Sequence, residues 1–278
     1  MEIQIEKMTP KDMNFAIFMA ETEGWNPGLN DAECFYSADP DGFFIAKRDG
    51  RNIGCISAVK YSQDFGFIGF YVVIPEERGS TAGVLLAKRA GAHLNGCNIG
   101  LDGVINRVEN YAKLGFNFAY KNYRFESIAK CYPLDEHVIR LGSVDFAEIL
   151  AYDRKCFPAE REVFMKNWLN MPNMKALAYK YDGKLMGFGG VRQCKIGWKI
   201  GPLFADSPGI ANKLFQGLSN FTAGKSLYFD VPEINNESMK LTRLYGMTEV
   251  FSTARMYTDL APLIDYNKIY SITSFELG

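Results

Sequence analysis

The sequence repeats itself at about half its length, and this constrains the fold more than any other feature. The run AKRDGRNIG at positions 46–54 corresponds to YKYDGKLMG at positions 179–187. In both runs an Asp-Gly pair separates two apolar stretches, which is typical of a β-hairpin closed by a tight turn. We interpret the repeat as a duplicated domain.

The match continues on both sides of the hairpin with small drifts in spacing. The matching pairs downstream are Ile68-Gly69 with Ile200-Gly201, Gly115-Phe116 with Gly246-Met247, and Arg124-Phe125 with Arg255-Met256. We therefore predict two domains, a first copy over residues 1–130 and a second copy over residues 136–278. The joint lies near Pro133, which interrupts the pattern.

Each copy has the same order of predicted elements. In the first copy these are a strand (3–7), a helix (11–23), a hairpin (43–61), a strand (65–74), a helix (83–94), a strand (98–104), a helix (105–114) and a final strand pair. This order predicts an α/β fold in which a mixed, mostly antiparallel sheet is flanked by helices. A further strand is predicted at 269–277, after the second copy.

Composition excludes several classes of function. The 31 basic and 32 acidic residues give a net charge of −1, which disfavours nucleic acid or an anionic membrane as a partner. The longest apolar run, 65–75, is too short to span a bilayer, and no signal peptide is evident, so we expect a cytoplasmic protein. Six scattered cysteines and two histidines predict no metal site.

The segment from Tyr71 to Gly83 is the first candidate for chemistry. An apolar strand ends at Pro75, a turn of small residues follows, and a helix begins. Such a turn directs backbone N–H groups toward one point beside the positive end of a helix dipole, which favours a phosphate group. An ordinary strand–turn–helix connection contains glycine as well, so the loop alone leaves both readings open.

The run V-x-P-x-x-R-G-x-x-x-G in this loop resembles the acyl-CoA motif of the GNAT superfamily, whose usual core is Q/R-x-x-G-x-G/A. The resemblance implies acetyl-CoA as acyl donor. Thr81 departs from the motif where a glycine is expected, and a β-branched residue disfavours positive φ. The implied cofactor-binding residues are Tyr71, Val72, Val73, Arg78, Gly79, Ser80, Thr81, Ala82 and Gly83.

A second run, Asn110 to Phe116, resembles the late helix of the same superfamily, which ends in Y-x-x-x-G-F. The resemblance implies that Tyr111 protonates the departing CoA thiolate and that Asn106 contacts the cofactor. The alternative reading of Tyr111 is an aromatic side chain packed on a helix face.

The segment Glu23-Gly-Trp-Asn-Pro-Gly28 resembles tandem GNAT proteins, in which this region lies over the acceptor side of the cleft. The resemblance implies Trp25, Asn26 and Asp31 as substrate-binding residues. A capped helix end with a packed tryptophan is the other reading. For the catalytic base the sequence offers Glu21 and Glu23, and we take Glu23 as the candidate.

The second copy lacks the arginine and the tyrosine that the resemblance assigns to cofactor binding and catalysis in the first copy. Its corresponding loop contains no arginine and carries Asp206, and Thr242 stands at the position of the tyrosine. Asn235 retains the spacing of the family's asparagine. We therefore predict a degenerate GNAT-like second domain and one active site per chain.

The expected activity is direct transfer of an acetyl group from acetyl-CoA to a primary amine of a small molecule or peptide. Two alternatives remain: a CoA-binding sensor or scaffold without catalysis, and a GNAT-fold transferase with another acyl donor. We expect a monomer or homodimer. The sequence identifies neither the acceptor nor the acyl chain length.

Overall fold

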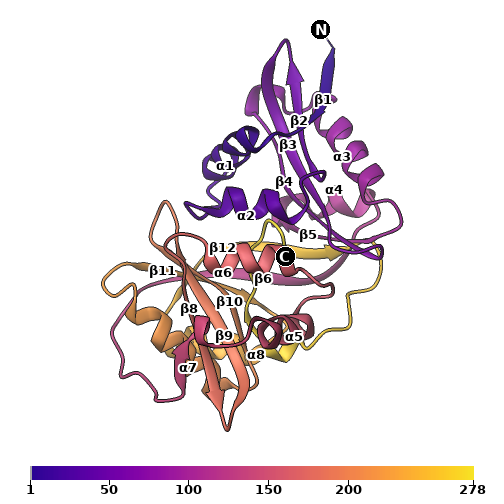
Figure 1. Cartoon of the computed structure of the whole chain (residues 1–278). Helices are drawn as coiled ribbons and strands as arrows, with labels where there is room; N and C mark the ends of the chain where they lie inside the picture. The colour runs from indigo at the N-terminus through magenta and orange to yellow at the C-terminus, as the bar shows by residue number, and fades with distance from the viewer. Residues whose placement is uncertain (1) are drawn as a thin grey trace.

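The computed structural model describes residues 2–278, whose thirteen strands join into one sheet, and Figure 1 shows the first copy above the second. The fold is a mixed α/β fold, as the sequence predicts. The elements of the first copy are β1 (Ile3–Lys7), α1 (Met13–Thr22), α2 (Asp31–Ala38), β2 (Phe43–Arg48), β3 (Arg51–Lys60), β4 (Phe65–Val73), α3 (Ala82–His93), β5 (Asn98–Val104), α4 (Val108–Lys113) and β6 (Asn117–Ile128).

The second copy repeats this order. Its elements are β7 (Val138–Arg140), α5 (Phe146–Cys156), α6 (Glu162–Asn170), β8 (Lys175–Tyr181), β9 (Lys184–Gln193), β10 (Trp198–Ala205), α7 (Pro208–Asn220), β11 (Ser226–Pro232), α8 (Asn236–Leu244), β12 (Thr248–Tyr257) and β13 (Ile269–Ser271). Short 3-10 turns precede several of the helices. The strand predicted at 269–277 covers only Ile269–Ser271 and is therefore shorter than expected.

Both predicted hairpins are confirmed. Arg48 pairs with Arg51, and Tyr181 pairs with Lys184. Each two-residue turn has two left-handed residues, with φ of 52° and 76° in the first copy and 47° and 72° in the second. Asp-Gly tolerates this backbone, whose twist matches that of the flanking strands.

Helix α3 illustrates how the apolar pattern places a helix on the sheet. Ala82, Leu86, Ala90 and Leu94 recur every fourth residue, and all four are buried. This face packs on β1 to β4, while α1 contacts β3 and β4. Helix α7 covers β8, β9 and β10 in the same way in the second copy.

The strand that follows the last helix of each copy, β6 or β12, lies in the other copy's part of the sheet. The strand order is β5-β12-β6-β11, so β12 pairs with β5 and β6 pairs with β11. The prediction of a final strand pair within each copy is wrong, because each copy has one long strand instead. The boundaries 1–130 and 136–278 stay a prediction, but hydrogen bonding continues across them.

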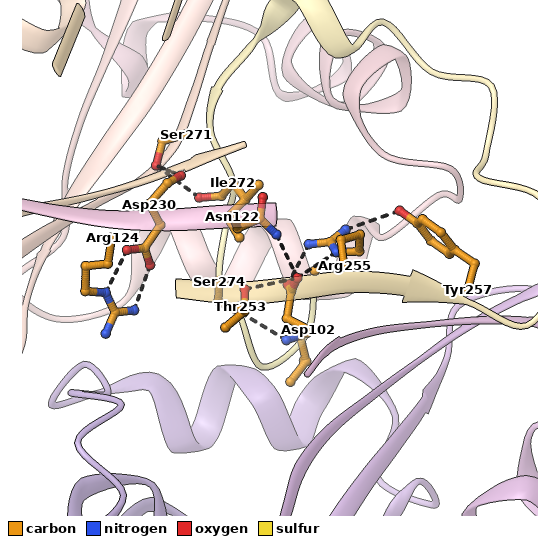
Figure 2. A network of polar contacts seen from close by, with 12 residues as sticks. Asp102, Asn122, Arg124, Asp230, Thr253, Arg255, Tyr257, Ser271, Ile272 and Ser274 are labelled. Atoms are coloured by element: carbon orange, nitrogen blue, oxygen red, sulfur yellow. Dashed lines mark hydrogen bonds and ion pairs between the residues drawn. The ribbon is translucent and has the colours of Figure 1, made fainter. Parts of the chain in front are cut away.

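Buried ion pairs connect the two copies along this exchange (Figure 2). Arg255 of β12 donates from Nε and Nη2 to the two carboxylate oxygens of Asp102, at 2.9 and 2.7 Å. Arg124 of β6 donates to both oxygens of Asp230, at 2.7 and 2.8 Å. All four side chains are at most 7% exposed. Separating the copies would leave these charges unpaired, which is costly in a protein interior.

A third buried pair and an aromatic stack join the copies on the helical side. Arg192 of β9 donates to Asp31 of α2, with Nε and Oδ1 2.9 Å apart. Phe35 stacks on Trp168 of α6, with ring centroids 5.7 Å apart. The two copies therefore share one core cluster rather than meeting at a hydrated interface.

We predict that Asp230→Ala lowers the free energy of unfolding by about 3–5 kcal/mol, because Arg124 is left as a buried unpaired charge. The matched control is Glu237→Ala, which removes the exposed ion pair with Lys240 and should cost at most about 1 kcal/mol. Urea unfolding followed by circular dichroism checks both values. Equal losses in the two variants would contradict the account.

Candidate functional site

The site lies where two parallel strands separate. β4 and β5 pair from Phe65↔Asn98 to Ile68↔Leu101, and beyond that point no pairing joins them. A cavity of about 780 Å³ occupies the gap. Because β5 leaves the edge of β4 after Ile68, backbone groups on that edge are open to a ligand.

A bulge bends β4 at the edge of this cavity. The register against β3 shifts between Cys55 and Ser57, and Phe70 has a φ of 47°. The Phe70 ring is buried and packs edge-on against Phe35 with centroids 5.6 Å apart. Burial of this ring opposes relaxation of the left-handed backbone. Such bulges redirect backbone groups near functional sites.

The loop after β4 presents unpaired donors. Within residues 2–278, the backbone N–H groups of Gly79, Thr81, Gly83 and Val84 have no hydrogen-bond acceptor. They lie at the start of the twelve-residue helix α3. Unpaired N–H groups and the helix dipole together favour an anion at this place.

Thr81 fits this loop without strain. Its φ of −74° and ψ of −7° belong to the right-handed helical region, and the left-handed position is Gly79, with a φ of 88°. The departure from the glycine-rich pattern therefore does not disturb the backbone. The sequence could not indicate which residue of the loop carries the positive φ.

Arg78 stands half-exposed at the mouth of the cavity. Its guanidinium forms an ion pair with Glu23, and its Nε donates to the Val73 carbonyl oxygen at 3.1 Å. An anionic ligand at the loop would compete with Glu23 for Arg78. Without such a ligand the ion pair occupies Glu23, which also lines the cavity, and its role as the base stays a prediction.

Tyr71 and Gly83 pack closely together in the cavity wall. The Tyr71 hydroxyl donates to the Gly83 carbonyl oxygen at 2.8 Å. A Cβ atom on residue 83 would lie 3.1 Å from that hydroxyl, so only glycine leaves this approach undisturbed.

Tyr111 lies on the opposite wall, on the short helix α4. Its ring lies against Gly103, where a Cβ atom would be 2.4 Å from the ring, and packs edge-on against Phe116 at 6.5 Å. Burial raises the pKa of Tyr111 to about 12, so the phenol keeps its proton at neutral pH. Asn106 lines the same wall. The structure thus brings Tyr111, Asn106 and the Arg78 loop around one cavity.

The three residues expected to bind substrate separate into two groups. Trp25 lines the cavity, but Asn26 and Asp31 do not. The Asn26 side chain bonds to the backbone N–H and carbonyl oxygen of Ile196, at 3.1 and 2.9 Å. Asp31 pairs with Arg192 and accepts from the Gly28 N–H at 2.7 Å. Both residues join the copies, and the expectation that they contact substrate has no support in this geometry.

The second copy contributes five residues to the cavity wall, and sequence reasoning identified none of them. They are Phe251, Ser252, Thr253, Phe275 and Glu276. Phe251 and Phe275 lie 5.9 Å apart between ring centroids, and the Arg124 guanidinium lies 4.7 Å from the Phe275 ring. No sequence signal indicates them. The exchanged strand β12 brings residues 251–253 to the first copy, and the segment after β13 brings Phe275 and Glu276.

The corresponding gap in the second copy is filled by the chain itself. β10 and β11 pair in parallel from Trp198↔Leu227 to Ile200↔Phe229 and then separate. β13 enters there, pairs with β10 and is followed by Ile272, whose N–H donates to the Asp230 carbonyl oxygen at 3.0 Å.

The loop of the second copy also offers fewer free donors. Ser207 caps α7 with its own side chain, and Pro208 has no N–H. Asp206 accepts from the Tyr152 hydroxyl at 2.7 Å and from Lys268 at 2.6 Å. Asn235 donates to the carbonyl oxygens of Asn267 and Ile269, at 3.1 and 3.0 Å, and so holds the inserted segment. These contacts favour a single site in the first copy.

In the described part of the chain, no three His, Cys, Asp or Glu side chains gather as a metal site would require. None of the helices formed by residues 2–278 is both long and apolar enough to cross a membrane.

Comparison with known proteins gives the same assignment for both copies. Two family models match, "Acetyltransferase (GNAT) family" over residues 11–116 and "Acetyltransferase (GNAT) domain" over residues 149–271. The chain is 28% identical to the holothin acyltransferase of Pseudoalteromonas sp. (strain SANK 73390), over 93% of this chain and 89% of that protein.

Two solved structures have the same fold. A putative acetyltransferase from Pyrococcus horikoshii superposes with a TM-score of 0.86 at 21% identity, over 99% of this chain and 96% of that chain. A tandem GNAT protein from the clavulanic acid biosynthesis pathway superposes with a TM-score of 0.63 at 10% identity, over 94% of this chain and all of that chain.

Proposed function

This chain belongs to the GNAT superfamily as a tandem two-domain member, and on that premise we propose that its first copy transfers an acyl group from acyl-CoA to a primary amine. One observation carries the proposal. The gap between β4 and β5 is open, and it lies between the loop whose free N–H groups favour an anion and Tyr111, whose phenol keeps its proton at neutral pH. The equivalent gap in the second copy contains β13.

The proposed cofactor site follows the geometry of the gap. The pantetheine arm lies along the open edge of β4, from Tyr71 to Val73, and takes the place of a paired strand. The pyrophosphate accepts from the free N–H groups of the loop, and Arg78 adds positive charge once it leaves Glu23. Asn106 contacts the cofactor from the opposite wall.

In the proposed reaction the amine attacks the thioester carbonyl carbon directly. A C–N bond forms, the C–S bond breaks, and Tyr111 donates its proton to the departing sulfur. The bend at Phe70 provides a backbone N–H for the developing oxyanion. The reaction requires neither a metal nor a covalent enzyme intermediate.

Acetyl-CoA is the donor we propose, and the acceptor is a small-molecule or peptide amine. The acceptor enters at the end of the cavity walled by Trp25, Phe251 and Phe275. The Pseudoalteromonas relative is named an acyltransferase rather than an acetyltransferase, so longer acyl donors are the second candidate. A panel of acyl-CoA thioesters of increasing length, assayed for release of free CoA, distinguishes the two.

We expect Gly83→Trp to lower the affinity for acetyl-CoA by about tenfold or more, because the indole would occupy the approach to the loop and displace Tyr71. The matched control is Gly91→Trp on the same helix, where a Cβ atom meets nothing within 4 Å. Calorimetric titration of acetyl-CoA measures both affinities. Binding unaffected in Gly83→Trp would remove the proposed site.

Tyr111→Phe should lower kcat by about 100-fold or more at neutral pH while leaving the affinity for acetyl-CoA unchanged, because only proton donation to sulfur is lost. Tyr181→Phe, at an exposed position of the second copy, serves as control. Release of free CoA, followed with a thiol reagent, gives the rates. A kcat equal to that of the control would show that Tyr111 only packs.

A further inference from the structure

The wall of the cavity contains one carboxylate whose hydrogen-bonding capacity is unused. Glu276 is 3% exposed and lines the cavity. Neither of its carboxylate oxygens has a hydrogen-bond partner among the described residues. Buried polar groups are almost always hydrogen-bonded, so an orphaned carboxylate beside a cavity calls for an explanation in terms of chemistry or ligand.

Glu276 lies beside the bend of β4. Its backbone carbonyl oxygen packs on Gly69, where a Cβ atom would be only 1.9 Å away. Gly69 immediately precedes Phe70, the left-handed residue of the bulge. Under the proposed function, the thioester carbonyl lies at this bend, so Glu276 is close to the reacting carbon.

The charged groups around Glu276 form ion pairs or hydrogen bonds with other residues. They are Lys199 of β10, Arg124 of β6, Arg192 of β9 and Asp31 of α2. Each arginine forms a buried ion pair with an aspartate, and Lys199 donates to the Asn26 carbonyl oxygen at 2.8 Å. Burial raises the pKa of Glu276, and the three cations oppose this shift. The carboxylate therefore has lone pairs free to accept a proton.

The segment that carries Glu276 is firmly held. After β13 it crosses from the second copy to the first, where the Tyr61 hydroxyl donates to the Leu277 carbonyl oxygen at 2.9 Å. Arg161 donates to the Thr273 hydroxyl at 2.9 Å, and the Ser274 hydroxyl accepts from the Leu277 N–H at 3.1 Å. These bonds fix the backbone on both sides of residue 276.

We propose that Glu276 accepts the proton of the attacking amine, which makes the second copy a chemical contributor to the first copy's site. This proposal rests on the proposed function. An alkylammonium of pKa about 10.4 provides about one free amine in a thousand at neutral pH, so a proton acceptor is needed. Glu276 takes one proton from the alkylammonium before attack, because an ammonium nitrogen has no lone pair, and later releases that proton to solvent. As the C–N bond forms and the C–S bond breaks, the Tyr111 proton passes to sulfur and the remaining surplus proton of the nitrogen restores the Tyr111 hydroxyl.

The test compares Glu276→Gln with the wild-type chain, using acetyl-CoA and two amines as probes. 2-Phenylethylamine is ionised near neutral pH, whereas aniline is not. We expect kcat/KM for 2-phenylethylamine to fall by about 100-fold or more at pH 7 and to recover as the pH approaches that amine's pKa. The deficit with aniline should be much smaller, because aniline arrives without the extra proton.

Several readouts separate this role from a structural one. In Glu276→Gln the affinity for acetyl-CoA should stay unchanged. Glu276→Asp should retain part of the activity. Glu249→Gln, a change at an exposed position, should have the same kcat/KM as the wild-type chain. A Gln variant with the wild-type pH–rate profile overturns the proposal, and so does an equal deficit with both amines. If the wild-type chain neither binds acetyl-CoA nor acylates either amine, the proposed function fails and the role of Glu276 falls with it.

Stability gives an independent check on the same carboxyl group. Because the folded-state pKa of Glu276 is raised, the folded chain holds that proton more tightly than the unfolded chain. Its contribution to stability is therefore greatest at acid pH and declines as the pH rises from the ordinary value of 4.5 through the raised pKa. Glu276→Gln should thus be at least as stable as the wild-type chain at pH 8, with a gap that narrows toward pH 4. A Gln variant that is less stable at pH 8 would contradict burial of an unpaired carboxylate.

Discussion

The pairing of β12 with β5 and of β6 with β11 is the constraint on which the rest of the structure depends. Main-chain hydrogen bonds alone would not specify partners, since any two exposed edges can pair. The buried pairs Asp102–Arg255 and Arg124–Asp230 hold the exchanged strands in place, because separating them would leave each charge without its counterion in the protein interior. Each copy is therefore structurally incomplete without the other, despite the repeated sequence.

The two copies share a fold but differ in what occupies the same gap in the sheet. In both, two parallel strands separate after a few paired residues, and the backbone groups on the separated strand edges need hydrogen-bond partners from the chain, from water or from a ligand. In the second copy β13 occupies the gap. In the first copy it stays open, and the loop beside it keeps unpaired N–H groups. The same inserted segment then reaches the first site, so closing one gap contributes a wall to the other.

Part of the candidate site was predictable, because it lies in short contiguous stretches of the first copy. From the predicted loop Arg78, Gly79, Ser80 and Gly83 line the cavity, as does Tyr111, whereas Thr81 and Ala82 do not. Asn26 and Asp31 are polar residues in a plausible place, yet their partners Ile196 and Arg192 belong to the other copy. Local sequence cannot distinguish a side chain that binds a substrate from one that pairs with a distant residue, since both are polar residues at a helix end.

The sequence by itself determined the duplicated α/β fold, the hairpins closed by Asp-Gly, the helix α3 with its apolar face, and the loop of small residues before that helix. All of these arise from short-range periodicity and backbone preference, which a contiguous segment carries within itself. Only the tertiary structure decided that the last strands are exchanged, that β13 closes the second gap and that Phe275 and Glu276 wall the first. Those features depend on which of two nearly equivalent sheet edges a strand joins. The edge that each strand joins is fixed by contacts between residues more than a hundred positions apart, such as Arg124–Asp230 and Arg255–Asp102, and local sequence does not record such contacts.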